Sequence, residues 1–196
     1  MNKSFLPVCG FILMAFFAQA QTSSGNMMVG GALEFESSSR QGSNLNDASS
    51  LYFSPSFGYF LGDNLAIGAG ISVGSSSSGT GDAKTVTSNF GFGPFARYYL
   101  FTSNDRFAFF GHAGLHFGTG KTNPPFGADT KSSSISFSVA PGAAYFFNEH
   151  WALELALRGI SVSSSDPNTA NDNDKTTRFN FGVSSFSPSL AFRYHF

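Results

Sequence analysis

Large hydrophobic residues alternate with small or polar residues along most of the chain after residue 25. A repeat of two residues is the period of a β-strand that presents different faces to different surroundings. Most of the alternating segments are longer than the roughly 9–11 residues that a tilted strand needs to cross a bilayer. The pattern predicts eight strands, at residues 26–36, 51–61, 65–75, 85–101, 106–119, 133–147, 151–163 and 178–196.

The segments between these strands are short and long in turn. Residues 62–64, 102–105 and 148–150 are rich in Gly, Asn and Asp and predict tight turns. Longer loops rich in Ser, Thr and Asn are expected at 37–50, 76–84, 120–132 and 164–177. This alternation is typical of outer-membrane barrels, which have short periplasmic turns and longer external loops. Eight strands would leave both chain termini on the periplasmic side.

The composition favours a membrane protein that crosses with strands. Charged residues make up 12% of the chain and aromatic residues 16%, with 25 Phe, whereas soluble domains have about 25% charged residues. After residue 20 there is no apolar run of the roughly 20 residues that a transmembrane helix needs. The net charge of −1 and the lack of a basic cluster argue against a nucleic-acid partner.

The bulky residues are expected to face lipid. In the segment 151–163, Trp151, Leu153 and Leu155 share one face, while Glu154 and Arg158 share the other. An eight-stranded barrel encloses only enough space for side chains or one small ligand. A soluble, lipocalin-like barrel with the bulky face inward is the alternative, but it would be overfilled and would expose mainly Gly, Ala and Ser.

Aromatic residues are expected at both membrane interfaces, as in outer-membrane barrels. One predicted girdle lies beside the short turns and comprises Tyr59, Tyr98, Tyr99, Tyr145, Trp151 and Tyr194. The opposite girdle comprises Phe35, Phe53, Phe90, Phe117, Phe137 and Phe179.

A proline precedes an aromatic residue by four positions in every second strand, at Pro55, Pro94, Pro141 and Pro188. Proline cannot donate a hydrogen bond to a neighbouring strand. We therefore expect a bulge or bend in each of these strands.

The first 20 residues have the features of a secretory signal. Lys3 precedes an apolar stretch at residues 5–17, and Ala18 and Ala20 form a cleavage site. We expect cleavage after Ala20, which leaves residues 21–196 as the barrel domain. Cys9 would leave with the signal, so the mature chain would contain no thiol.

Two stretches resemble a known family. The last seven residues, LAFRYHF, look like the C-terminal signal of Gram-negative outer-membrane proteins, and residues 54–74, SPSFGYFLGDNLAIGAGISVG, look like hairpins of small porin-family proteins with an outer membrane protein beta-barrel domain. The resemblance implies an eight-stranded barrel of the outer membrane protein X or A type, with a structural or adhesive role. It also implies that Phe192, Tyr194 and Phe196 are read by the barrel-assembly machinery.

Ionisable residues on the small-residue faces are expected inside the barrel. They are Glu34, Arg97, His112, His116, Glu154, Arg158 and Arg193. Buried charges must pair because an isolated one is costly. Strand positions suggest the pairs Glu154–Arg193 and Glu34–Arg158. This network could act as a structural plug or as a selective, gated path.

No metal, cofactor or enzymatic site is expected. His112 and His116 would lie about 13 Å apart along a strand, too far to bind one ion. Asp172 and Asp174 lack the Gly and Glu that would complete a calcium loop. No combination of Ser, His and an acid stands out as catalytic.

The sequence therefore predicts an all-β protein of the outer membrane, an eight-stranded antiparallel up-and-down transmembrane barrel with a packed polar lumen. The leading functional prediction is a structural or surface-interaction role, in which the external loops meet an unidentified extracellular ligand. A narrow channel for small or hydrophobic solutes is the alternative, followed by a lipid-modifying enzyme.

Overall fold

The described part of the chain forms ten strands in the computed structural model. It comprises residues 22–38, 47–80, 83–157, 159–170, 175–181 and 189–196. The strands are β1 (Met27–Ser38), β2 (Asp47–Gly62), β3 (Leu65–Thr80), β4 (Ala83–Phe101), β5 (Phe107–Asn123), β6 (Thr130–Phe146), β7 (Trp151–Ala156), β8 (Ile160–Asp166), β9 (Thr176–Phe181) and β10 (Ser189–His195).

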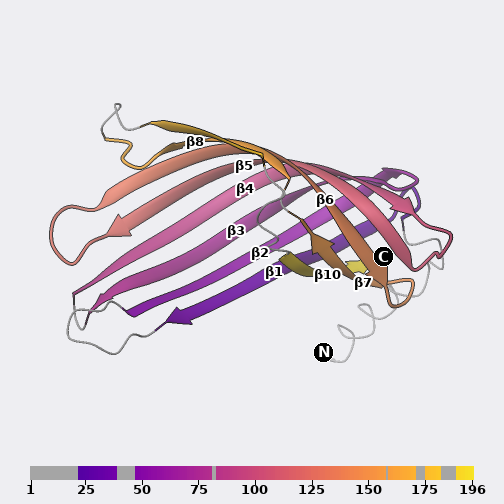
Figure 1. Ribbon diagram of the computed structural model, residues 1–196, viewed down its shortest axis with the longest axis horizontal. Helices are drawn as coiled ribbons and strands as arrows, with labels where there is room; N and C mark the ends of the chain where they lie inside the picture. The colour runs from indigo at the N-terminus through magenta and orange to yellow at the C-terminus, as the bar shows by residue number, and fades with distance from the viewer. Residues whose placement is uncertain (1–21, 39–46, 81–82, 158, 171–174, 182–188) are drawn as a thin grey trace, which may run out of the picture.

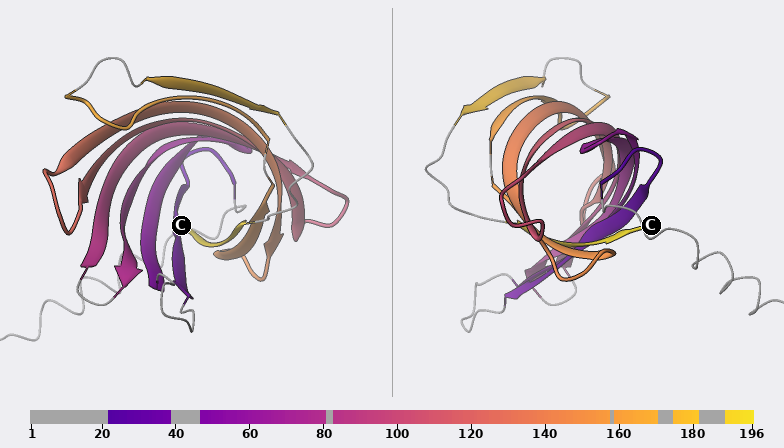
Figure 2. Two further views of the ribbon diagram at one scale, coloured as in Figure 1. Left: turned by 60° about the vertical axis from the view of Figure 1, so that its left-hand side comes forward. Right: turned by 90° about the vertical axis from the view of Figure 1, so that its right-hand side faces the viewer.

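Eight of these strands close into a ring. Antiparallel pairing runs in the order β5-β4-β3-β2-β1-β10-β7-β6, and β6 pairs back to β5. β8 continues beside β6, and β9 pairs with β8, so these two extend the seventh and eighth strands of the barrel (Figure 1). Figure 2 shows the curvature of the sheet around the barrel axis. The predicted eight-stranded up-and-down barrel is confirmed.

The first and last strands meet at the end of the barrel that carries the short turns. The backbone N–H groups of Met27 and Phe196 donate to each other's carbonyls over 2.7 and 2.9 Å. β1 and β10 pair from Met28 opposite His195 to Gly31 opposite Phe192. The longer connections lie at the opposite end of the barrel (Figure 1).

The bulky residues face outward, as predicted. Phe57, Ile67 and Phe109, for example, expose about half of their surface, whereas Ala66 and Ala108 on the other face are fully buried. None of the described residues forms a helix that is long and apolar enough to span a membrane. Exposed large apolar side chains such as Phe57, Ile67 and Phe109 lie on the outer face of the sheet.

The predicted seventh strand contains a bulge that reverses its faces. Pairing with β6 passes from Gly142 opposite Ala156 to Val139 opposite Ile160, so two residues of β6 stand opposite three of the neighbouring strand. An extra residue shifts the alternation by one position. Before the bulge the outward residues are odd-numbered, such as Leu155, whereas after it they are even-numbered, such as Ile160.

Several segments that were predicted to be loops are strands. β3 and β4 pair as far as Thr80 opposite Ala83, although residues 76–84 were expected to form a loop. Cross-strand hydroxyl pairs accompany this extension, including Ser49 Oγ with Ser77 Oγ at 3.0 Å. Serine has no large apolar side chain, so the period of two was invisible there even though the backbone pairing continues.

The prolines interrupt the pairing, but none of the described ones adds the extra residue of a bulge to its own strand. The pairing of β2 with β3 lapses at Ser54 and Pro55, and it resumes at Ser56 in the same register. The pairing of β4 with β5 lapses in the same way at Pro94. At Pro141 the extra residue lies on the opposite strand. Each of these three prolines thus falls at a local gap or irregularity in the pairing, while its own strand gains no residue. Pro188 lies outside the described residues.

The predicted girdles need one correction. Tyr59, Tyr98, Tyr145 and Trp151 lie on the outer surface beside the short turns, and each of the six Phe residues of the opposite girdle is exposed. Tyr99, in contrast, is completely buried inside the barrel. It follows Tyr98 directly in β4, and consecutive residues of a strand point to opposite faces.

Candidate functional site

An apolar plug fills the lumen at the short-turn end. We use this name for Met28, Phe60, Tyr99, Phe110 and Phe146, which are each at most 3% exposed. Their rings pack closely, with centroids 6.0 Å apart for Phe60 and Tyr99 and 5.8 Å apart for Tyr99 and Phe110. The expectation of a polar interior is therefore wrong at this end, because large side chains from several strands meet on the barrel axis.

Glycines on neighbouring strands make room for these large inward side chains. A Cβ atom on Gly142 would lie 2.2 Å from the Phe110 ring, and one on Gly58 would lie 2.5 Å from the Met28 side chain. Gly68 accommodates Phe95 in the same way. In each pair a glycine on the inward face stands directly opposite a large inward residue. Such pairs can be recognised in the sequence only when the register of the strands is known.

A charge network crosses the lumen above the apolar plug. Nη1 of Arg97 donates to both carboxylate oxygens of Glu154 at 2.6 Å, and the Tyr99 hydroxyl donates to Glu154 Oε1 at 2.7 Å. Nε of Arg193 donates to the same carboxylate, and its Nη1 donates to Ser56 Oγ at 3.0 Å. The participants come from β2, β4, β7 and β10, so the network ties opposite walls of the barrel together.

The structure brings together only some of the residues predicted for this network. Glu154 and Arg193 lie on paired strands, while Arg97 reaches Glu154 across the lumen. His112 accepts long hydrogen bonds of 3.4 Å from Arg97. Glu34 is exposed on β1 and has no contact with this network, and Arg158 lies outside the described residues.

Sequence reasoning missed Tyr99 and Ser56 as members of the network. Tyr99 was detectable, because it lies two residues after Arg97 and therefore on the same inward face. Ser56 is one of many inward serines, and nothing in the sequence distinguishes it from the others.

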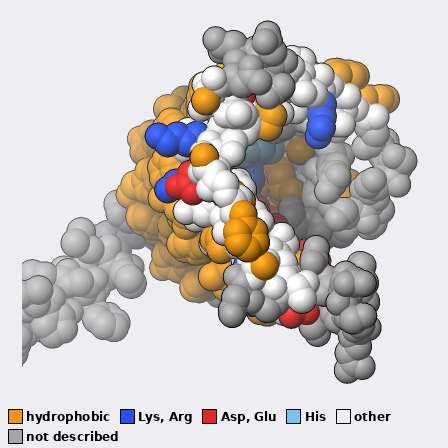
Figure 3. Space-filling view, turned by 90° about the vertical axis from the view of Figure 1, so that its left-hand side faces the viewer, with side chains coloured by type: hydrophobic (Ala, Val, Ile, Leu, Met, Phe, Trp, Pro, Cys, Tyr) orange, Lys and Arg blue, Asp and Glu red, His pale blue; other side chains and the backbone are white. Residues whose placement is uncertain are grey.

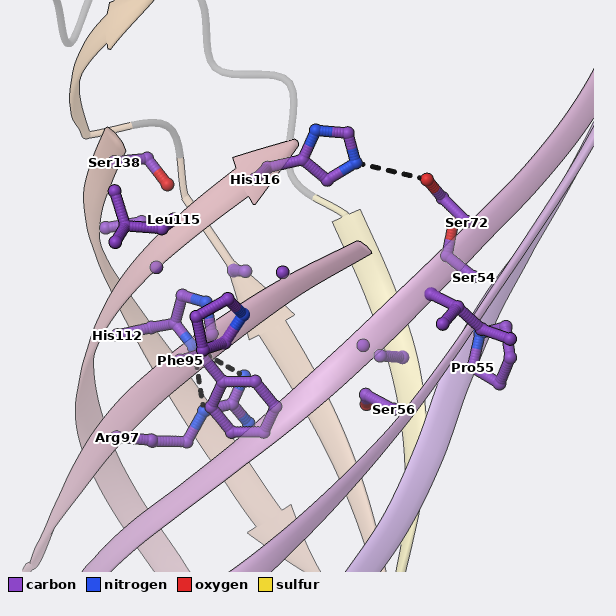
Figure 4. Close-up of a pocket in the computed structure, with 18 of the residues that line it drawn as sticks. Ser54, Pro55, Ser56, Ser72, Phe95, Arg97, His112, Leu115, His116 and Ser138 are labelled. Carbon is purple, nitrogen blue, oxygen red and sulfur yellow. Dashed lines mark hydrogen bonds between the residues drawn. The ribbon is translucent and has the colours of Figure 1, made fainter. Parts of the chain in front are cut away.

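A cavity of about 400 Å³ lies above the network, and we call it the central cavity. Arg97, Arg193 and Glu154 are among the residues that line it. Figure 4 shows Arg97 beside His112 and Phe95, with Ser56 and Ser138 on other parts of the wall. The Phe95 and His112 rings pack at 5.2 Å.

A hydrogen bond from β5 to β3 marks the upper boundary of the central cavity. His116 Nε2 and Ser72 Oγ lie 3.1 Å apart, and Figure 4 shows them reaching toward each other. The intervening strand β4 carries Gly91, where a Cβ atom would lie 2.2 Å from His116 Nε2. Both partners also line a second, polar pocket toward the long-loop end, which has Asn89, Thr119 and several serines in its wall.

The two histidines have different neighbours and do not face a common point. His112 lies against Arg97, whereas His116 contacts Ser72. Within the described ranges, no group of three or more potential metal ligands comes together. Asp172 and Asp174 lie outside these ranges.

The C-terminal residues form an aromatic cluster on the outer surface. Phe192 is 60% exposed and Phe196 is 37% exposed. The Tyr194 ring packs 5.0 Å from Trp151 and 5.9 Å from Phe196. The three residues of the predicted assembly signal therefore lie at the seam that closes the ring.

Comparison with known proteins agrees with the ring topology and the outward apolar surface. Residues 8–185 match the family described as "Outer membrane protein beta-barrel domain". The chain belongs to this family. A comparison with curated proteins gives no match.

Solved structures similar to this family member are small barrels. Neisserial surface protein A is 18% identical with a TM-score of 0.49, and the match covers 87% of this chain and 97% of that one. The N-terminal β-barrel domain of Pseudomonas aeruginosa OprF is 12% identical, with a TM-score of 0.44 and coverage of 88% and 98%. OprG from the same organism is 15% identical, with a TM-score of 0.45 and coverage of 91% and 99%.

Membership of the outer membrane protein beta-barrel family assigns the chain to the outer membrane. Its strands are transmembrane strands. The short-turn end of the barrel then corresponds to the periplasmic side, and the long-loop end corresponds to the external side.

Proposed function

We propose that this protein is a closed outer-membrane barrel with a structural or surface-interaction role, exerted through its external loops, and that it does not act as a solute channel. One observation carries the proposal: the apolar plug and the charge network fill the periplasmic end of the lumen. Eight-stranded barrels commonly fill their interior with side chains.

Phe126 supports a role for the external loops. It lies in the connection between β5 and β6, and 84% of its surface is exposed. Lys121 and Asp129 form a salt bridge of 2.7 Å beside this connection. Binding residues are often carried on loops that a rigid scaffold positions, and Phe126 is an exposed aromatic residue on such a loop. The outward apolar faces of the strands suit contact with outer-membrane lipid.

Conductance tests the closed lumen. Refolded protein in planar bilayers is expected to give no steady ion conductance, and Glu154→Ala is expected to behave likewise because the apolar plug remains. A steady conductance of the unmodified protein would favour the alternative, a narrow channel that uses the central cavity as part of its path.

Glu154→Ala should nevertheless lower stability. The change leaves Arg97 and Arg193 buried without their carboxylate, which costs about 3–5 kcal/mol. Urea unfolding in lipid, followed by the heat-modifiable gel shift, measures the loss. Glu34→Ala is the matched control, because Glu34 is exposed and should cost no more than about 0.5 kcal/mol. Equal losses of unfolding free energy for Glu154→Ala and Glu34→Ala would contradict the role of Glu154 as the centre of a buried charge network.

We also propose export by a signal peptide that is cleaved after Ala20, together with assembly by the barrel-assembly machinery. Thr22 supports this boundary, because its hydroxyl donates to Asn64 Oδ1 at 2.5 Å and its carbonyl accepts from Asn64 N at 2.8 Å. Intact-mass analysis of protein from outer membranes should give a chain that begins at Gln21, and a heavier species would contradict this.

A further inference from the structure

The wall of the central cavity contains an excess of positive charge. Arg97 and Arg193 share one carboxylate, and Glu154 is the only acidic residue among the described residues that line this cavity. With the histidines neutral, two guanidinium groups and one carboxylate leave one positive charge. Tyr99 does not offset it, because its hydroxyl retains the proton that it donates to Glu154.

No other described carboxylate faces this excess charge. Asp166 is also buried, but it lines the second pocket, and its Oδ1 accepts a hydrogen bond from the backbone N–H of Asn168. Glu34 is exposed on β1 and is absent from the cavity wall. The positive charge is therefore not balanced by protein groups within the described part of the lumen.

The unbalanced positive charge of Arg97, Arg193 and Glu154 would be stabilised by a bound counter-ion. Arg97 and Arg193 are 5% and 8% exposed in their side chains, and a buried charge is costly unless it is paired. The central cavity provides about 400 Å³ of space beside both guanidinium groups, with the hydroxyls of Ser56 and Ser138 in its wall. Guanidinium N–H groups match the geometry of carboxylate oxygens better than that of a spherical ion.

The central cavity is approached from the external end. The second pocket shares Ser72 and His116 with it and continues toward the long loops. Figure 3 looks into this end of the molecule and shows a hollow with histidine, basic and acidic side chains at depth. The apolar plug closes the opposite side, so a bound ion would be held above it.

We propose that the central cavity is a binding site for a small monovalent oxyanion of the carboxylate type, which enters from outside the cell and neutralises the excess charge of Arg97 and Arg193. The site is independent of the proposed role of the loops, and it requires only that the periplasmic end of the lumen be closed.

Equilibrium dialysis of radiolabelled acetate against refolded barrel in zwitterionic detergent tests this site. We expect saturable binding of a single acetate per barrel. Arg193→Met removes the excess charge and should weaken binding about ten- to a hundredfold, the value of a hydrogen bond to a charged group. Glu154→Gln raises the excess charge and should strengthen binding.

Two further variants separate the site from general effects. Lys121→Met removes an exposed cation that is paired with Asp129, and it should change acetate affinity by no more than about twofold. Ser138→Leu fills part of the central cavity without changing its charge and should abolish binding. The heat-modifiable gel shift verifies folding of every variant, and Ser138→Leu provides the test if Arg193→Met does not fold.

Three results would overturn the proposal. The first is that the unmodified barrel shows no saturable acetate binding. The second is that folded Arg193→Met and Ser138→Leu bind acetate with the same affinity as Lys121→Met. The third is that an equal concentration of chloride displaces the acetate. The last result would show that the site recognises charge alone and not a carboxylate.

Discussion

At the scale of single residues, the face of the strand decides the role of a side chain. Tyr98 and Tyr99 are adjacent and chemically identical, yet Tyr98 is 47% exposed on the outside whereas Tyr99 is buried and donates to Glu154. Tyrosine suits both places, because its ring tolerates apolar surroundings and its hydroxyl seeks a polar partner. Grouping tyrosines by their nearness to the short turns therefore placed Tyr99 wrongly.

The two tyrosines give a matched pair of variants. Tyr99→Phe removes one of the donors to a buried carboxylate and should lower the free energy of unfolding by about 1.5–3 kcal/mol. Tyr98→Phe should change it by no more than about 0.5 kcal/mol. Unfolding in urea at constant lipid composition measures both. A Tyr98 loss that equals or exceeds the Tyr99 loss would refute the assigned faces.

Residue pairs were predictable only where the strands are neighbours. Glu154 and Arg193 lie on adjacent strands at nearly the same height, so the sequence suggested their contact. Arg97 lies on β4, which is separated from β7 by β5 and β6. The period of two predicts that a side chain points inward, but it does not predict which residue that side chain contacts across the lumen. That contact depends on the diameter of the barrel and on which neighbouring residues are glycine.

At the scale of elements, the sequence contains a signal for the bulge in the seventh strand. The outward apolar residues are odd-numbered up to Leu155 and even-numbered from Ile160 onward. A similar change separates Phe181 in β9 from Leu190 in β10, across residues outside the described ranges. Treating 151–163 and 178–196 as uninterrupted strands overlooked this change. The six other strands were found from their alternation, although several of them extend into segments that were predicted to be loops.

Gly159 is expected to be required at the bulge. A Cβ atom there would lie 1.8 Å from the carbonyl oxygen of Val139, which is a backbone atom and cannot turn away. Gly159→Ala should therefore lower the free energy of unfolding by about 1–3 kcal/mol, as overpacking does. Gly111→Ala is the control, because its Cβ would meet nothing within 4 Å. Comparable losses of unfolding free energy for Gly159→Ala and Gly111→Ala in urea would show that the close approach of Gly159 to Val139 is not the cause.

At the scale of the whole molecule, the amino-acid pattern predicted the barrel and the outward face of its strands, because each strand in contact with lipid has one bulky apolar face. It did not predict the division of the lumen into an apolar plug, a charge network and an open polar region. That division depends on heights along the barrel axis, which follow from the register of the strands. A one-residue change of register would move every inward side chain outward.

The C-terminal aromatic cluster gives a prediction about assembly in the cell. Phe196→Ala should reduce the folded, heat-modifiable fraction in outer membranes, because the resemblance implies that the assembly machinery reads this residue. Phe181→Ala, which alters another exposed outward phenylalanine, should have a smaller effect. Purified Phe196→Ala should still refold in lipid. If purified Phe196→Ala also fails to refold in lipid, the loss is due to packing against Tyr194 and not to recognition of Phe196 by the assembly machinery.

The charge network also depends on strands that are far apart in the sequence. Its members lie in β2, β4, β7 and β10, so Glu154 cannot gather Arg97, Tyr99 and Arg193 until chain segments far apart in sequence have met. A chain that has made only its first hairpins still holds these charges in water. Contacts of such long sequence separation form late and slowly. The full set of contacts therefore requires that β10 lie near β2 and that β7 face β4, which is the arrangement of a closed barrel and not of an open sheet.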